Sequence, residues 1–169
     1  MSSPRVCRGV VTLEVILTFP IIFILFLSVI EFGMLYTLSQ QVAFASRYGA
    51  KIASEEVVAG IPSLNTSGGG SRLRLAIDQH LSEAGVSESC SVTLQHNVGG
   101  LAETQIDSPA TPADCECVAH VDYYPFGQPY VRVTVCVDVS ENIPDLLGSF
   151  GFSIDDTIIE VSTTFAYEN

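Results

Sequence analysis

The sequence has few basic residues. Lysine and arginine together number 7 against 19 aspartates and glutamates, which gives a formal net charge of −12 at pH 7. An acidic chain of this kind is repelled by nucleic acid and by anionic lipid headgroups. The sequence also has no basic segment interleaved with aromatic residues, the usual footprint of nucleic-acid binding. Nucleic acid is therefore not predicted to be a partner.

The common signatures of catalysis are missing as well. The sequence contains no His-Glu-x-x-His pattern and no Gly-x-Ser-x-Gly elbow, and its histidines are isolated from one another. The acids Asp155 and Asp156 do not belong to a loop of alternating oxygen ligands, which favours a solvated acidic turn over a calcium site. The chain is therefore predicted not to be an enzyme, with no catalytic residue, no metal site and no cofactor.

What the sequence does contain is a long apolar segment near its start. Residues 15–30 carry no charge, and residues 10–30 would form a helix of about 31 Å, which matches a hydrocarbon core of about 30 Å. Arg5 and Arg8 precede this segment, so the N-terminus is predicted to be cytoplasmic and the rest extracytoplasmic. A cleaved secretory signal is the alternative, but the small-residue site Ala43-Phe44-Ala45 lies too far beyond the apolar run.

One acid, Glu14, lies inside this segment. A carboxylate in a bilayer costs several kcal/mol unless it is paired, so its presence requires an explanation. If the chain is cut between Gly9 and Val10, the new ammonium group of a neighbouring subunit can pair with Glu14 and align the two helices. If the chain stays uncut, Glu14 lies about one turn into the membrane and can reach the headgroups instead.

The N-terminal third of the sequence resembles the TadE-like family, the minor pseudopilins of the tight-adherence (Tad/Flp) pilus system. The resemblance covers roughly residues 5–55. The residues that carry it are Arg8-Gly9, Glu14, Phe19-Pro20, Glu31-Phe32-Gly33, Tyr36 and Ala45-Ser46-Arg47-Tyr48-Gly49-Ala50.

This resemblance implies how the chain is processed and where it acts. A prepilin peptidase would cut between Gly9 and Val10, which makes Glu14 the fifth residue of the processed chain. The implied partners are that peptidase, other pilin or pseudopilin subunits, the Tad inner-membrane platform and membrane lipid. The resulting organisation is a cytoplasmic leader (1–9), a transmembrane helix (10–33), a helical stalk (34–59), a flexible loop (60–71) and an exported domain (72–169).

The helix is predicted to continue beyond the membrane. Apolar residues recur at helical spacing up to residue 59, which gives one helix of about 75 Å over residues 10–59 before Gly60-Ile61-Pro62 ends it. A face of small residues, typical of close helix–helix approach, includes Ala45, Gly49, Ala50 and Ala53. This face packs either against partner helices or against the protein's own outer domain.

The outer domain is predicted to be α+β. Residues 72–84 have the pattern of a second short helix that Gly85 terminates, and residues 143–150 suggest a short helical turn. Four segments rich in β-branched and aromatic residues are predicted strands of a small, mostly antiparallel sheet: residues 91–98, 116–123, 130–139 and 158–167. Within the third, the odd-numbered valines from 131 to 139 share one face. The whole is a pilin-like fold, with a long N-terminal helix backed by this sheet.

Cleavage after Gly9 would remove Cys7 and leave an even set of cysteines in an exported domain. Such a set is typical of disulfides, with three possible pairings. Unpaired thiols and a four-thiolate zinc site are the alternatives, but zinc sites usually need two closely spaced cysteine pairs. The cysteines concerned are Cys90, Cys115, Cys117 and Cys136.

The sequence therefore predicts a minor pseudopilin-like subunit of the bacterial inner membrane. It would be processed after Gly9 and take part in assembly of a Tad-type pilus, used for adhesion or secretion. The alternative is a permanently anchored single-span protein with an extracytoplasmic binding domain.

Overall fold

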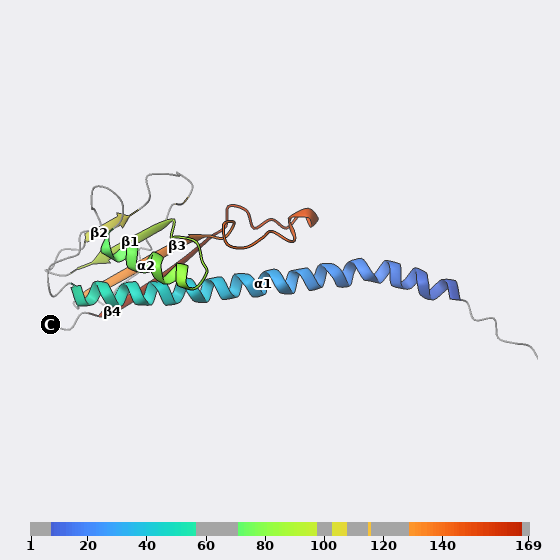
Figure 1. Ribbon diagram of the computed structural model, residues 1–169, viewed down its shortest axis with the longest axis horizontal. Coiled ribbons are helices and arrows are strands. Elements are labelled where there is room, and N and C mark those ends of the chain that lie inside the picture. The colour runs from blue at the N-terminus through green and yellow to red at the C-terminus, as the bar shows by residue number, and fades with distance from the viewer. Residues whose placement is uncertain (1–7, 57–70, 98–102, 108–114, 116–128, 167–169) are drawn as a thin grey trace, which may run out of the picture.

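The computed structural model describes residues 8–56, 71–97, 103–107, 115 and 129–166 of the 169-residue chain. One very long helix runs beside a small α+β domain and projects far beyond it (Figure 1). This architecture confirms the pilin-like α+β fold expected from the sequence. In chain order the elements are α1 (Arg8–Glu56), α2 (Arg72–Glu83), β1 (Ser91–His96), β2 (Glu103–Asp107), β3 (Tyr130–Asp138), the 3-10 turn η3 (Gly148–Phe150) and β4 (Ile158–Ala166).

Helix α1 is continuous over 49 residues and includes Pro20 in its interior. It begins two residues before the predicted range 10–59, and residues 57–59 lie outside the described residues. Its C-terminal half packs against the domain, where it contacts α2, β3 and β4. The N-terminal end of the helix projects beyond every other described element (Figure 1). The periodic apolar residues beyond the membrane-length segment therefore form one helix with it.

The sheet has four strands in the order β2-β1-β3-β4, and every neighbouring pair is antiparallel. Strand β3 lies in the centre, paired with β1 on one side and with β4 along its full length on the other. The valines expected to share one face of β3 are all fully buried and belong to one core cluster: Val131, Val133, Val135, Val137 and Val139. The residues between them, Arg132, Thr134 and Cys136, are buried as well.

The core lies between this sheet and the two helices. Helix α1 contributes Leu38 and Val42, and α2 contributes Leu73, Ile77 and Leu81, all buried in one cluster with the β3 valines. These apolar residues of α2 recur every four residues, so they line the one face of the helix that meets α1 and the sheet. Burial of this face compensates for the low stability of so short a helix.

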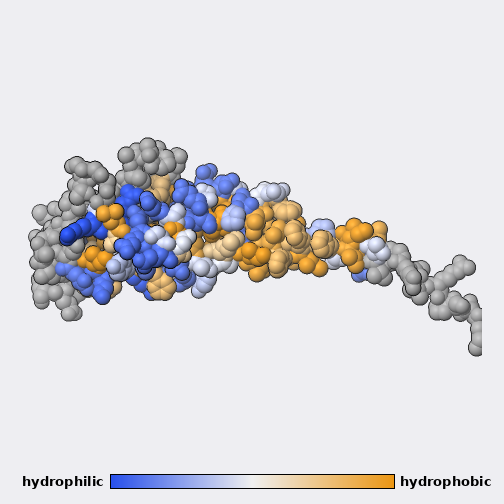
Figure 2. Space-filling model, viewed as in Figure 1, coloured by the Kyte–Doolittle hydropathy of each residue, from blue (hydrophilic) through white to orange (hydrophobic). Residues whose placement is uncertain are grey.

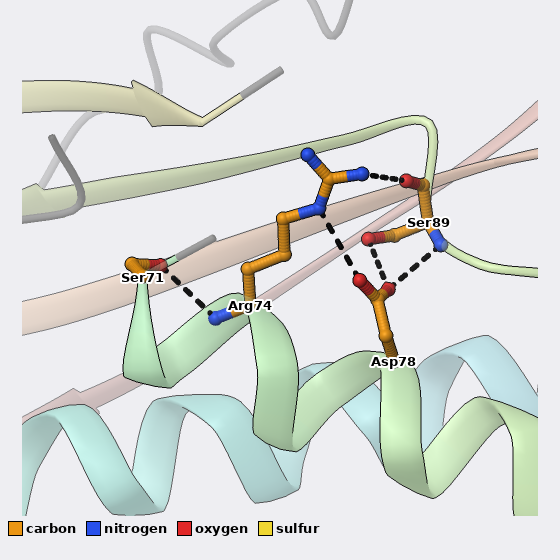
Figure 3. Close-up of polar contacts among 4 residues, drawn as sticks. All are labelled: Ser71, Arg74, Asp78 and Ser89. Carbon is orange, nitrogen blue, oxygen red and sulfur yellow. Dashed lines mark hydrogen bonds and ion pairs between the residues drawn. The ribbon is translucent and has the colours of Figure 1, made fainter. Parts of the chain in front are cut away.

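Polar contacts fix α2 to the start of β1 (Figure 3). The Ser71 hydroxyl caps the helix by accepting from the Arg74 amide at 3.1 Å. The buried Arg74 guanidinium pairs with Asp78 at 3.2 Å and donates to the Ser89 carbonyl at 2.9 Å. Asp78 accepts in turn from the Ser89 amide at 2.8 Å. Because the charge of Arg74 is compensated in place, this corner can be buried without an orphaned ion.

Helix α2 ends as the sequence predicted. Gly85 follows its C-cap with φ of +76°, a left-handed conformation that glycine adopts at low cost. The short helical turn expected near residues 143–150 is the 3-10 turn η3. Strand β2 was not predicted, and the predicted strand at 116–123 lies outside the described residues, as does the loop at 60–70.

Candidate functional site

The projecting half of α1 is the most unusual surface of the molecule. Most of its large apolar side chains from Leu13 to Ile30 are exposed along the helix. Figure 2 shows them as a mostly orange column beyond the polar domain, and this surface is called the apolar column below. Soluble proteins rarely expose an apolar patch of this extent. The helix is long and apolar enough to cross a membrane, and none of its most apolar 18-residue stretch is buried within the protein. The expected membrane segment is thus not a core helix.

Glu14 lies within this apolar column. Its side chain is exposed, and its backbone carbonyl accepts a hydrogen bond from the Thr18 hydroxyl one turn later. Among the residues that the structure describes, no basic side chain forms an ion pair with it. Glu14 is therefore an acid on an apolar helix with no neutralising group in its own described structure.

Gly9 and Val10, the residues on either side of the predicted cut, belong to the first turn of α1, which begins at Arg8. Cys7 lies outside the described residues. The backbone at the predicted cut is therefore helical, and it stands at the end of the column furthest from the outer domain (Figure 1).

The small-residue face of α1 lies inside the protein's own domain. Ala45, Ala50 and Ala53 are fully buried in it. A Cβ added to Gly49 would lie 2.7 Å from Cδ1 of Ile77 on α2 and 3.3 Å from Cγ1 of Val133 on β3. These positions let α1 approach α2 and the sheet closely. Because α2 and the sheet cover them, a helix of a partner subunit cannot contact them.

Ser46 on the same face joins α1 to two strands. Its hydroxyl donates to the Val133 carbonyl at 3.0 Å on β3 and lies 2.9 Å from the Thr163 hydroxyl on β4. Because Ser46 is fully buried, these hydrogen bonds fix the helix against the sheet at one rotation about its axis. The stalk half of α1 is thus an integral part of the outer domain.

Sequence reasoning assigned no role to a second acid on α1, Glu31. Its side chain is only 3% exposed, although it follows directly on the apolar run. Oε2 of Glu31 accepts a hydrogen bond of 3.0 Å from the backbone amide of Leu147, in the loop between β3 and β4. A glutamate at the end of an apolar segment was the signal in the sequence, but its partner lies 116 residues away.

Three cysteines among the described residues are disulfide-bonded. Cys90 is bonded to Cys115, with their Cα atoms 5.8 Å apart, which selects one partner for Cys90 among those that the sequence left open. Cys136 on β3 is also disulfide-bonded, and its carbonyl accepts from the Cys90 amide at 2.9 Å. Cys117 lies outside the described residues.

The described acidic and histidine side chains of the outer domain make contacts with neighbouring residues of the fold. No group of three His, Cys, Asp or Glu side chains that would hold a metal ion occurs within the described ranges. His80 stacks on Tyr48, with ring centroids 5.3 Å apart, and so packs α2 against α1. Asp145 and Asp155 both accept hydrogen bonds from the Ser153 hydroxyl in the β3–β4 loop. The contacts of these residues are structural.

Together these features define an α+β protein of pilin-like architecture, whose long N-terminal helix carries an exposed apolar column. Residues 9–51, most of α1, match the family model described as TadE-like protein. This match confirms the resemblance that the sequence indicated over the same part of the chain. No curated protein and no solved structure matches the chain.

The TadE-like family suggests involvement in the Tad pilus system. The match covers the helix and ends before α2. Association with Tad pilus machinery is therefore the functional class that the comparison indicates, and it rests on α1.

Proposed function

We propose that the chain is a minor pseudopilin of a Tad-type pilus in the bacterial inner membrane. Residues 1–9 form a cytoplasmic leader that a prepilin peptidase removes between Gly9 and Val10. The apolar column of α1 crosses the bilayer, and residues 72–169 form the extracytoplasmic domain. The subunit then associates with other pilin or pseudopilin subunits and with the inner-membrane assembly platform, in a pilus that serves adhesion or secretion.

The observation that carries this proposal is the unpaired acid on the exposed column. After cleavage, the new ammonium of Val10 stands four residues before Glu14, about 6 Å along the helix. A neighbouring subunit displaced axially by roughly that distance would bring its own ammonium beside Glu14. In a bilayer such a pair relieves the penalty of an isolated carboxylate, so subunit contact is favoured at one axial register.

The packing of α1 also argues against a secretory signal cut after Ala45. Such a cut would remove Leu38 and Val42 from the core and would separate Ala45 from Ser46, which is bonded to the sheet. Loss of two large core side chains costs about 2–5 kcal/mol each, a large share of a domain's stability. The stalk is therefore better explained as a permanent part of the exported protein.

The test is the intact mass and N-terminal residue of the protein purified from its native membrane. A chain that begins at Val10, with or without methylation, supports peptidase processing and the pilus assignment. A chain that still carries Cys7 and Arg8 contradicts it and leaves the permanently anchored binding protein. Two glycine variants sharpen the result: G9L is expected to retain the leader, whereas G33A, on the same helix with open space for a Cβ, is expected to be processed normally.

A further inference from the structure

The connection between β3 and β4, residues 139–157, does not turn back at the edge of the sheet. It runs beside α1 toward the apolar half of the helix before it returns (Figure 1). Its far end carries η3 and the buried Leu147. A groove of about 390 Å³ separates the two, with Ile24, Leu25 and Ser28 on the helix and Phe152 and Ile154 on the loop. The groove runs along α1 from Ile24 to Leu35, so the far end of the connection reaches the level of Ile24.

That level lies within the apolar column. Ile24 precedes Ile30, the last residue of the uncharged run, by six residues, which is about 9 Å along the helix axis. One leaflet's hydrocarbon layer is about 15 Å thick. If α1 spans a bilayer with residues 15–30 in the hydrocarbon, the loop tip beside Ile24 reaches into the outer leaflet.

The side chains at the tip fit an apolar environment. Phe150 is 45% exposed and Phe152 is 68% exposed, although both are large apolar residues. We define the tip as residues 147–152, which contain no acid. The acids of the connection lie on either side of it: Glu141, Asp145, Asp155 and Asp156. The connection contains no lysine or arginine, so it has no attraction for anionic headgroups, and zwitterionic lipid is the surface that it fits.

Most backbone amides of the tip form hydrogen bonds within the protein, as a segment that leaves water requires. The Leu147 amide donates to Glu31 and the Gly148 amide donates to Oδ1 of Asp145 at 2.6 Å. The amides of Phe150, Gly151 and Phe152 all donate to backbone carbonyls inside the tip. Irregular backbone is tolerated at membrane depth only where its polar groups are satisfied by protein. Five of the six backbone amides of the tip are thus paired within the protein, which lowers the cost of moving the tip out of water.

We propose that the β3–β4 connection is a second membrane contact, which inserts Phe150 and Phe152 into the outer leaflet of zwitterionic lipid beside α1. The inserted tip fixes the rotation of the outer domain about the helix and holds the domain against the membrane before assembly. This inference rests on the spanning of a bilayer by α1, which is part of the proposed function, but not on cleavage or pilus assembly.

The full-length chain has no tryptophan, so single Phe→Trp variants report on one site each. The variants are F152W at the loop tip, F23W in the apolar column as the membrane reference, and F165W near the end of β4 as the reference in water. Each is reconstituted into phosphatidylcholine vesicles, with and without lipid brominated on its acyl chains. Quenching by acrylamide, which stays in the aqueous phase, measures how far each tryptophan is exposed to water.

The expected result is that F152W resembles F23W. Both should show blue-shifted emission, loss of intensity in brominated lipid and protection from acrylamide, while F165W should be quenched by acrylamide alone. If F23W is quenched by brominated lipid and F152W only by acrylamide, the loop contact is wrong and the anchor stands. If neither is quenched by brominated lipid, α1 does not span the bilayer, and both this inference and the proposed anchor are wrong.

One further outcome would assign the tip to a protein partner. If F152W is protected from both quenchers, and acrylamide reaches it once the protein is diluted with excess lipid, the tip contacts a second copy of the chain. That result would overturn the lipid contact.

Discussion

Oε2 of Glu31 on α1 lies 3.0 Å from the backbone nitrogen of Leu147 and accepts its hydrogen bond. The contact joins the end of the apolar column to the tip of the β3–β4 connection, and it buries a carboxylate where an apolar side chain would be expected. A buried donor left without its acceptor costs about 1–3 kcal/mol. The Glu31 carboxylate therefore holds the loop tip against the helix.

Replacement of Glu31 by leucine should release that tip. We expect E31L to lose about 1–3 kcal/mol of local stability, because the Leu147 amide stays buried with no acceptor. Hydrogen exchange of the Leu147 amide in the full-length chain should accelerate accordingly. The matched variant E31Q keeps a carbonyl oxygen in the same place and should exchange nearly as slowly as the wild type. Unchanged exchange in E31L would show that the hydrogen bond does not hold the loop.

Gly49 should not tolerate even one added methyl group. In G49A the Cβ would lie 2.7 Å from Cδ1 and 2.9 Å from Cγ1 of Ile77, so the Ile77 side chain or the two helices would have to shift, at a cost of about 1–3 kcal/mol. Thermal unfolding of the full-length protein in detergent should show a lower Tm. The substitution I77V removes the methyl group in conflict and should recover part of the loss in G49A/I77V.

The control for Gly49 is Gly33 on the same helix. A Cβ at Gly33 meets nothing within 4 Å, so G33A should be neutral or should stabilise the helix by up to about 1 kcal/mol. Equal destabilisation by G49A and G33A would mean that the helix backbone, and not its packing, is responsible.

Neutralisation of Glu14 should separate membrane insertion from assembly. E14Q is expected to accumulate in the membrane at the wild-type level but to be lost from the sheared pilus fraction, because the proposed pair with a neighbour's ammonium disappears. Immunoblots of the two fractions measure both effects. E55Q is the matched control, since Glu55 is an exposed acid on the same helix that pairs with Lys51 at 3.8 Å. Normal piliation by E14Q would refute the charge pair.

The disulfide between Cys90 and Cys115 should stabilise the outer domain substantially. Its sequence separation is 25, and closing a loop of that length contributes about 3.5 kcal/mol by the chain-entropy relation. Denaturant unfolding of C90S should show a loss of about that size. The double variant C90S/C115S should be no less stable than C90S, since the bond is already absent. A much smaller loss in C90S would indicate that the unfolded chain is already compact near these residues.

The parts of the fold that the sequence predicted are those governed by local periodicity. The apolar residues of α1 and α2 repeat at helical spacing, and the valines of β3 alternate, so burial of one face follows directly. Strand β2 was missed because Glu-Thr-Gln-Ile-Asp has one apolar residue and no clear alternation. Among the described strands it lies at an edge of the sheet, and its hydrogen bonds to β1 stabilise the extended conformation that its sequence alone does not favour.

The candidate site divides in the same way. Glu14 was found because an acid within an apolar run is visible in the sequence. The task of Glu31 was not, because a backbone amide carries no sequence signal and Leu147 reaches it only through the tertiary fold. The small residues of α1 were recognised as a packing face, but periodicity cannot say which surface covers them, and in the structure α2 and the sheet do.

The attachment of Ser46 to both β3 and β4 has a mechanical consequence. In Figure 1 both strands run lengthwise beside α1, and the helix passes without a break from the column into the domain. A pull on the N-terminal end of α1, along its axis, therefore loads the helix–sheet interface in shear, with buried side chains resisting together. The contacts of such an interface do not break one at a time, so tension on α1 moves the outer domain as one rigid body.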